Sequence, residues 1–326
     1  MTPRSWIEVT AAVVLGALAI WFLPQWLELF ALINATVYVS LAVLALSLAL
    51  IWGFGGILCF GQAAFFGLGG YAYAVAAINF GDTTPAIVLA LLIPALFAAF
   101  LGWFMFYGRL ADVYMGVITL TVTLILFKFF NSTAGDQWTI GKAPLGGFNG
   151  IPSTPPLNWP GRPDDPLYPE QVFVVAIVAL VLCYVGSKLF LASRLGRVAV
   201  AVRENELRAE LLGYDVRLVK LAVFTLGGLI AGLAGMLFAN CVFVSPTMFS
   251  LTYSAQVIVW VIVGGLGTLV GPVIGCILLQ MLTTWVGTLQ EVNANLVLGA
   301  ILVVAVLALP RGLLPTAGDL LGKLRR

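Results

Sequence analysis

Charged residues are scarce in this chain, and the largest group of them lies between residues 194 and 220. The stretch contains six basic and four acidic residues: Arg194, Arg197, Arg203, Arg208, Arg217 and Lys220, with Glu204, Glu206, Glu210 and Asp215. A connection between two helices needs only a few residues. A connection this long and this charged is therefore expected to bind something.

Apolar residues recur through the same stretch, mostly at intervals of three and four: Leu195, Val198, Val202, Leu207, Leu211 and Leu212. This spacing predicts a short amphipathic helix. Glu204 and Arg208 are four apart and in the order that stabilises a helix. Gly213 predicts the end of this helix, and Asp215 is suited to cap the next one.

The balance of charge indicates which surface this helix binds. A helix that lies on anionic lipid is basic, whereas this one carries acids and bases in nearly equal numbers. Mixed charge beside an apolar stripe favours a protein partner. A solvated loop and a helix on the lipid surface are the alternatives.

The chain lacks the groups that several other functions require. It contains no histidine, no HExxH sequence and no GxxxxGK[ST] sequence. No acid or base falls at the centre of an apolar run, where an ion-driven carrier keeps its ionisable groups. These absences argue against an ion-coupled carrier, a membrane-embedded enzyme and a nucleotide site in this chain. The cysteines Cys59, Cys183, Cys241 and Cys276 lie in apolar runs and are interpreted as packing residues.

The composition predicts an integral membrane protein, since 61% of the 326 residues are hydrophobic and 9% are charged. We expect an all-α polytopic protein with one transmembrane domain over residues 1–326. Crossing a bilayer takes about 20 apolar residues. About ten spans follow, near residues 7–23, 33–52, 59–80, 86–107, 113–131, 172–191, 219–242, 253–270, 271–287 and 295–310. The first is expected to be retained, because no small-x-small cleavage pattern follows it.

Glycine interrupts two of the apolar runs, at 53–61 and at 264–271, and each interruption is either a tight turn or a helix broken within the membrane. The orientation follows from the basic residues. With both termini in the cytoplasm, thirteen of the sixteen basic residues lie inside, and only Lys128, Lys142 and Arg162 lie outside. The net charge of +2 is too small to indicate binding to nucleic acid.

Segment 132–171 is expected outside the cell and is rich in proline and glycine. Dense proline opposes both helices and central strands. The segment is interpreted as an extracytoplasmic loop, with a docking surface for an external partner as the alternative.

Polar residues within the predicted spans are candidates for a translocation pathway: Gln62, Tyr71, Thr119, Thr121, Thr123, Asn240 and Gln256. The alternative is structural, because threonine hydroxyls in helices often bond to carbonyls of the preceding turn. Glycines at 228 and 232, and at 267, 271 and 275, recur every four residues. They predict close helix packing, with a glycine-lined pathway or hinge as the alternative.

Several of these stretches resemble one family. GRVAVAVRENELRAELLGYDVRLVKLAVFTLGGLIAGLAGMLFA is similar to the coupling segment and following helix of LivM-like permeases, the membrane subunits of branched-chain amino acid and urea/amide ABC importers. LCFGQAAFFGLGGYAYA and VWVIVGGLGTLVGPVIG resemble the early and late glycine-rich helices of that family, and PRGLLP resembles its C-terminal end. The resemblance covers nearly the whole chain.

The resemblance implies a permease fold and a set of partners. These are a second, LivH-like permease subunit, two cytoplasmic ATPase subunits that bind ATP and Mg, and an extracytoplasmic solute-binding protein. It implies a multi-pass protein of the bacterial or archaeal inner membrane that has no cofactor of its own. Residues 194–218 are then the coupling segment and 203–213 the coupling helix. The coupling residues expected are Arg203, Glu204, Glu206, Arg208, Glu210 and Gly213.

The resemblance leaves the solute open. Gln62 stands where many relatives have histidine. VWVIVGGLGTLVGP is closer to urea and amide permeases, and GGFNGIP to the amino-acid branch. A branched-chain amino acid is the leading solute and urea or a short amide the alternative. A stand-alone channel for a small neutral solute is a second alternative.

Overall fold

Long apolar helices fill most of the chain, because helices satisfy their own backbone polar groups and lipid cannot. The computed structural model describes residues 3–288 apart from 136 and 153, together with 299, 312–314 and 316. The longer helices are α1 (Pro3–Trp26), α2 (Leu29–Leu48), α3 (Gln62–Phe80), α4 (Thr83–Tyr107), α5 (Asp112–Ser132), α6 (Pro169–Ala192), α9 (Val216–Ala239), α10 (Leu251–Gly264) and α11 (Val270–Thr288).

Nine of the ten predicted spans coincide with one of these helices. Within the described residues, eight helices are long and apolar enough to cross a membrane, and α10 is a shorter apolar helix. The span expected near 253–270 is therefore wrong in length. Gly265 and Gly267 have positive φ angles of 115° and 86° and form a turn before α11. The tenth predicted span, near 295–310, lies outside the described residues except at 299.

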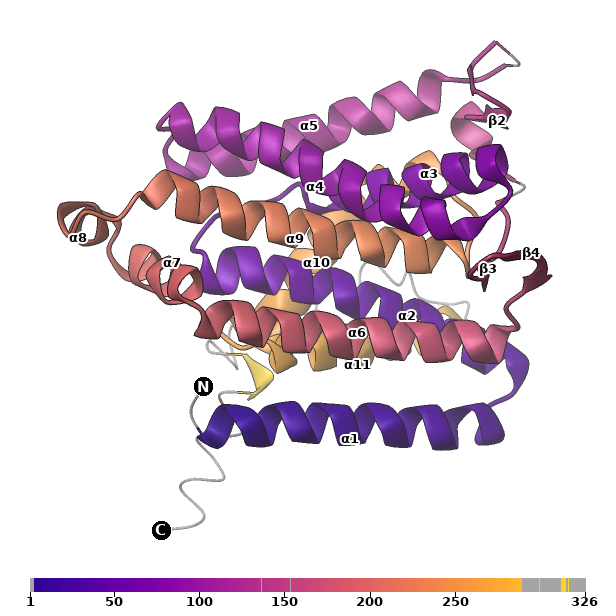
Figure 1. Cartoon of the computed structure of the whole chain (residues 1–326), viewed down its shortest axis with the longest axis horizontal. Helices are drawn as coiled ribbons and strands as arrows, with labels where there is room; N and C mark the ends of the chain where they lie inside the picture. Colours follow the sequence, from indigo (N-terminus) through magenta and orange to yellow (C-terminus); the bar gives the residue numbers. More distant parts are fainter. Residues whose placement is uncertain are drawn as a thin grey trace.

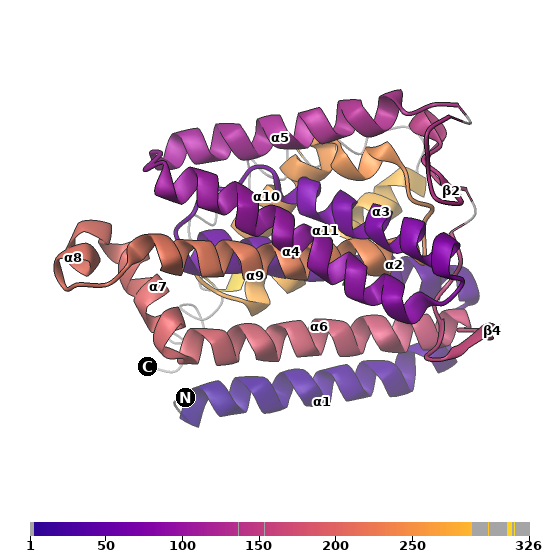
Figure 2. The same ribbon diagram turned by 45° about the horizontal axis from the view of Figure 1, so that its top comes forward.

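The helices lie side by side, with α9 packed against α2, α3 and α4 (Figures 1 and 2). Glycine permits this close packing, as predicted. A Cβ atom on Gly69 would lie 2.2 Å from the carbonyl oxygen of Gly232, and one on Gly235 would lie 1.9 Å from that of Phe66. Helix α1 lies at the rim beside α6.

The two ends of the bundle differ (Figure 1). One end carries two short helices, α7 (Arg194–Glu204) and α8 (Glu206–Leu211), which follow α6 and precede α9. We refer to it as the α8 end. The other end carries the four strands and is the hairpin end. Since α1 begins at the α8 end, the chain alternates between the two ends.

Two small antiparallel hairpins fold within residues 137–168. Strand β1 (Thr139–Ile140) pairs with β2 (Ala143–Pro144), and β3 (Asn158–Trp159) pairs with β4 (Arg162–Pro166). A 3-10 turn, η2 (Gly147–Asn149), lies between them, and a second, η3 (Pro246–Phe249), precedes α10. The prolines are accommodated because both strands of a two-stranded hairpin are edge strands.

Neutral amides attach these hairpins to the helices. Asn79 Nδ2 donates to the carbonyl oxygen of Ile140 at 2.8 Å. Asn158 Oδ1 accepts a hydrogen bond from Thr83 N at 2.9 Å. Asn240 Oδ1 accepts one from Leu157 N at 2.8 Å. The segment expected as a loop therefore contains two hairpins that are hydrogen-bonded to the helices.

Candidate functional site: the charged segment and a helix break

Helix α7 packs against the membrane helices through its small and apolar residues. Ser193 caps it, and the Ser193 hydroxyl accepts a hydrogen bond from Gly196 N at 3.2 Å. Ala199 and Val202 are buried, whereas Leu195 is exposed. Most of the apolar side of α7 therefore faces the bundle.

The single amphipathic helix predicted through this segment is wrong, because the helix breaks at Asn205. Asn205 has an extended backbone, and its Oδ1 accepts a hydrogen bond from Arg208 N at 2.9 Å. It ends α7 and caps α8. The break removes the helical spacing between Glu204 and Arg208, and Glu204 pairs with Arg203 at 3.0 Å.

Helix α8 projects from the bundle (Figure 1). Ala209 is buried against Val202 and Val216. Three leucines in and directly after α8 are 66%, 80% and 71% exposed: Leu207, Leu211 and Leu212. Gly213, with a φ of +87°, ends this turn of chain as predicted. The structure thus presents an apolar surface to solvent at the tip of the charged segment.

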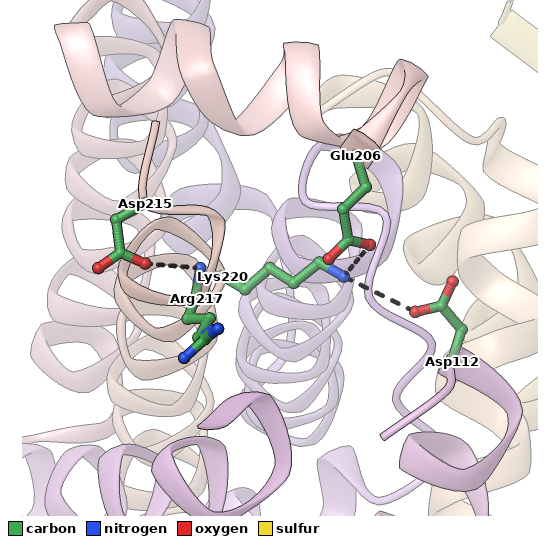
Figure 3. A network of polar contacts seen from close by, with 5 residues as sticks. All are labelled: Asp112, Glu206, Asp215, Arg217 and Lys220. Atoms are coloured by element: carbon green, nitrogen blue, oxygen red, sulfur yellow. Dashed lines mark hydrogen bonds and ion pairs between the residues drawn. The ribbon is translucent and has the colours of Figure 1, made fainter. Parts of the chain in front are cut away.

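Lys220 joins α8 to two membrane helices (Figure 3). Its Nζ lies 2.6 Å from Glu206 Oε2 on α8 and 3.9 Å from Asp112 Oδ1 at the start of α5. The Lys220 side chain is only 9% exposed, and these two carboxylates compensate its charge. Asp215 caps α9 as predicted, by accepting hydrogen bonds from Arg217 N and Leu218 N.

A groove of about 620 Å³ opens between α8 and the turn that joins α4 to α5. Its charged lining comprises Arg109, Asp112, Glu206, Glu210, Asp215, Arg217 and Lys220. Phe106, Met115 and Val216 add apolar surface. Arg208 and Glu210 are exposed on α8 itself. Together, groove and helix form a surface of mixed charge with exposed leucines.

Helix α2 does not end regularly at this side of the bundle. It continues as a π-helical turn, η1 (Ala49–Phe54), and residues 55–61 form no helix before α3 begins. Gly61 lies beside Thr119 and Thr123, about two and three turns into α5. The interruption predicted at 53–61 is therefore a break that runs into the bundle.

Three of the predicted pathway residues meet at this break. Gln62 is buried, and its Nε2 donates to Ser47 Oγ at 2.7 Å. Thr119 Oγ1 accepts a hydrogen bond from Phe60 N at 3.1 Å. Thr123 Oγ1 donates to the carbonyl oxygen of Gly61 at 3.3 Å. Thr119 thereby satisfies the backbone N–H of Phe60, which lies outside the helices.

The other four pathway candidates lie elsewhere. Tyr71 packs its ring against Phe130, with the ring centres 4.1 Å apart. Thr121 is exposed on another side of α5 and bonds back to the carbonyl oxygen of Val117. Asn240 belongs to the hairpin contacts described above, and Gln256 is half-buried on α10. Thr119 and Thr123 also bond back to their own helix, at Gly116 and Thr119.

The structure brings in residues that the sequence analysis did not single out as functional. Asn205 carries a local signal, since asparagine is a preferred helix cap. Asp112 and Lys220 are distant in sequence and meet only in the fold. Within the described residues, no group of three or more His, Cys, Asp or Glu side chains could hold a metal ion.

Comparison with known proteins places this arrangement in a family. Residues 30–306 match the family described as branched-chain amino acid transport system / permease component. The chain is 30% identical over 301 residues to the high-affinity branched-chain amino acid transport system permease protein LivM of Escherichia coli (strain K12). The matched region covers 86% of this chain and 69% of LivM.

A more distant relative is the ribose import permease protein RbsC of Escherichia coli (strain K12). It is 29% identical over 208 residues, or 60% of this chain and 59% of RbsC. No solved structure matches the chain significantly. The match over residues 30–306 and the likeness to LivM show that this multi-pass helical chain belongs to the permease components of branched-chain amino acid transport systems.

Proposed function

We propose that this chain is the transmembrane permease subunit of an ATP-binding cassette importer that moves branched-chain amino acids into the cell. It works with a second, LivH-like permease subunit, two cytoplasmic ATPase subunits that bind ATP and Mg, and an extracytoplasmic solute-binding protein. The whole chain forms one transmembrane domain of ten spans in the inner membrane of a bacterium or archaeon.

The observation that carries this proposal is α8. A short helix that exposes Leu207, Leu211 and Leu212 among charges of both signs is suited to a protein groove. Glu206, Arg208, Glu210 and Gly213 lie in or directly after the same helix. We assign residues 194–218 as the coupling segment, with α8 as the part that enters an ATPase subunit.

The distribution of charge supports the orientation. Among the described side chains, eight basic residues lie at the α8 end: Arg109, Lys188, Arg194, Arg197, Arg203, Arg208, Arg217 and Lys220. Lys128, Lys142 and Arg162 lie toward the hairpin end. By the positive-inside rule, this distribution supports a cytoplasmic α8 end and an extracytoplasmic hairpin end, and we propose that both termini are cytoplasmic.

Energy enters through the coupling segment. When ATP closes the two ATPase subunits, they move α8, and α8 moves the helices attached to it. Lys220, on α9, transmits this movement to α9 and α5, because it hydrogen-bonds Glu206 and forms an ion pair with Asp112. A ligand shifts such an equilibrium only through its different contacts in the two states. The contacts at the α8 end must therefore change during the cycle.

The translocation pathway follows the helix break. Non-helical backbone at membrane depth is found where it is buried in protein or lines a pathway, and broken helices supply the solute sites of many transporters. Gln62, Thr119 and Thr123 surround this break. They are the strongest pathway candidates, ahead of Tyr71, Thr121, Asn240 and Gln256.

The name of LivM, which matches most of the chain, favours branched-chain amino acids as the solute. Urea and short amides are the alternative that the sequence motifs support, and the likeness to the ribose permease adds ribose as a comparison solute. Selectivity in such importers is shared with the binding protein, so the complete complex is the correct object to test.

The test is purification followed by transport. The tagged chain should bring ATPase subunits with it from its native membrane. In liposomes with ATP on the α8 side and binding protein on the other, labelled leucine should enter faster than urea, acetamide or ribose. Faster uptake of urea or acetamide than of leucine would contradict the proposed solute. Uptake by the isolated chain without ATP would show that it is a channel.

A further inference from the structure

Arg203 contacts the first helix break of the bundle. It is the penultimate residue of α7, and its Nη1 donates a hydrogen bond to the carbonyl oxygen of Gly53 in the π-helical turn after α2. Its other terminal nitrogen, Nη2, lies 3.0 Å from Glu204 Oε1. The Arg203 side chain is 35% exposed, so most of it is covered by the bundle.

Glycine makes room for this side chain at the helix break. Gly56 has a φ of +68°, and a Cβ atom there would lie 2.8 Å from Arg203 Cγ and 3.2 Å from its Cα. Any other residue at position 56 would therefore be strained and would also displace Arg203.

The turn between α10 and α11 also lies beside the Arg203 side chain. A Cβ atom on Gly53 would lie 3.2 Å from Gly267 N, and one on Gly267 would lie 3.7 Å from Arg203 Nη1. The break at 53–61 and the turn at 265–269, between α10 and α11, thus both lie beside the Arg203 guanidinium group. Arg203 is where the charged segment touches both of them.

A guanidinium suits this position chemically. The π-helical turn and the non-helical residues after it leave backbone carbonyls with irregular partners. Arginine offers five donors in a rigid fork and stays charged, so it can hold a carbonyl of one element while it pairs with a carboxylate of another. Arg203 does this between Gly53 and Glu204.

We propose that Arg203 is a positioning residue that holds the cytoplasmic helix breaks closed and releases them when α7 moves. This rests on the proposed function, since it assigns a role within the same transport cycle. Release of Gly53 frees residues 55–61, which lead directly to Gln62 and to the threonines of α5. The coupling segment then acts through α7 on the pathway and through α8 on the ATPase.

The experiment compares Arg203→Ala with Arg203→Lys and with Arg197→Ala in the complete complex. Arg197 is the matched control, an exposed arginine of the same helix that donates to the carbonyl oxygen of Ala192. Arg203→Ala should keep its ATPase subunits and their ATP hydrolysis, while leucine uptake falls by about tenfold or more through loss of a charge-assisted hydrogen bond. Arg203→Lys should restore much of the uptake, and Arg197→Ala should reduce it far less than Arg203→Ala does.

A native thiol reports on the break directly. Cys59 lies within residues 55–61 and is buried. In a chain whose Cys183, Cys241 and Cys276 are replaced by alanine, Arg203→Ala should raise the rate at which N-ethylmaleimide labels Cys59 by about tenfold, as expected for loss of one such bond. In the Arg203→Lys and Arg197→Ala variants, Cys59 should be labelled at the original rate.

Two results would overturn this role. If Arg203→Ala loses its ATPase subunits, Arg203 belongs to the docking surface. If Cys59 labelling does not change, Arg203 does not hold the break. If the unaltered chain carries no ATPase, the proposed function fails, and the labelling rates still decide whether Arg203 closes the break.

Discussion

Two polar segments interrupt the membrane helices of this protein, and they are attached in opposite ways. The hairpin segment, residues 137–168, is fixed by the neutral amides of Asn79, Asn158 and Asn240. The charged segment, residues 194–218, is held by Arg203 and by the pairing of Glu206 with Lys220. The two segments lie at opposite ends of the bundle, and α8 projects from the charged one (Figure 1).

The difference indicates which segment is built to move. The hydrogen bond from Thr83 N to Asn158 is buried, so breaking it leaves unsatisfied groups. In the charged segment, Glu206 is 51% exposed, so its carboxylate can exchange Lys220 for water, while Lys220 keeps Asp112 as a second partner. The hairpin segment is therefore expected to stay in place while the charged segment changes its contacts. The predictions below test that contrast.

The largest effect is expected from the exposed leucines of the charged segment. Replacing Leu207, Leu211 and Leu212 together by serine should weaken binding of the ATPase subunits by about a hundredfold or more, since buried interface anchors each contribute about 2 kcal/mol. Co-purification measures this. The melting temperature of the isolated chain should not change, because these side chains are exposed.

Leu195→Ser is the control, an exposed leucine on α7. It should leave ATPase binding intact. If both variants lost ATPase binding equally, α8 and α7 would not differ in the roles proposed for them.

In the hairpin segment, Asn158→Ala should lower the free energy of unfolding by about 2–3 kcal/mol, because it leaves buried groups of Thr83 unsatisfied. Thermal unfolding in detergent measures this. Asn149→Ala, at an exposed asparagine of the same segment, should change stability by less than about 0.5 kcal/mol. A small effect at Asn158 would mean that the segment is not fixed as described.

Lys220→Met tests the charged attachment. It should cost about 1–2 kcal/mol of stability, discounted because Glu206 is half exposed. Salt should distinguish the two kinds of attachment. At about 1 M salt, the loss of stability in Lys220→Met should become smaller, whereas the loss in Asn158→Ala should remain. Lys142→Met, at an exposed lysine of the hairpin segment, is the control. Equal salt dependence of both effects would contradict the contrast.

The smallest effect concerns pH at the hairpin end. Hydrogen bonds from Thr84 and Asn158 lower the pKa of Asp82 from its ordinary value of 3.8. A lowered pKa adds stability above that ordinary value and loses it as the pH falls through the folded value. Unfolding measured between pH 6 and about 3 should therefore show a smaller pH dependence in Asp82→Asn. An unchanged slope would show that Asp82 does not contribute.

Local patterns in the sequence predict much of this fold. Apolar runs predict nine of the helices, Gly213 predicts a helix end, and Asp215 predicts a cap. These signals act over a few residues, so one sequence suffices to read them. Asn205 carries a signal of the same kind, but the apolar spacing on both sides of it favoured one continuous helix.

Contacts between residues that are far apart in the sequence could not be predicted from such local patterns. Periodicity could not show that Val202 faces the bundle while Leu207 faces solvent, because the two lie on separate helices. Nor could it bring Lys220 to Asp112 or Arg203 to Gly53, which depend on how α5, α2 and α7 pack. The alternating threonines of α5 illustrate the same limit, since Thr119 and Thr123 reach the break and Thr121 does not.

The central claim is that the charged segment binds the ATPase subunits and that the hairpin segment does not. Hydrogen exchange of the chain with and without its ATPase subunits tests it most directly. We predict slower exchange at residues 206–213 in the complex and unchanged exchange at residues 137–168. Unchanged exchange at 206–213 in a complex that still assembles would contradict this account.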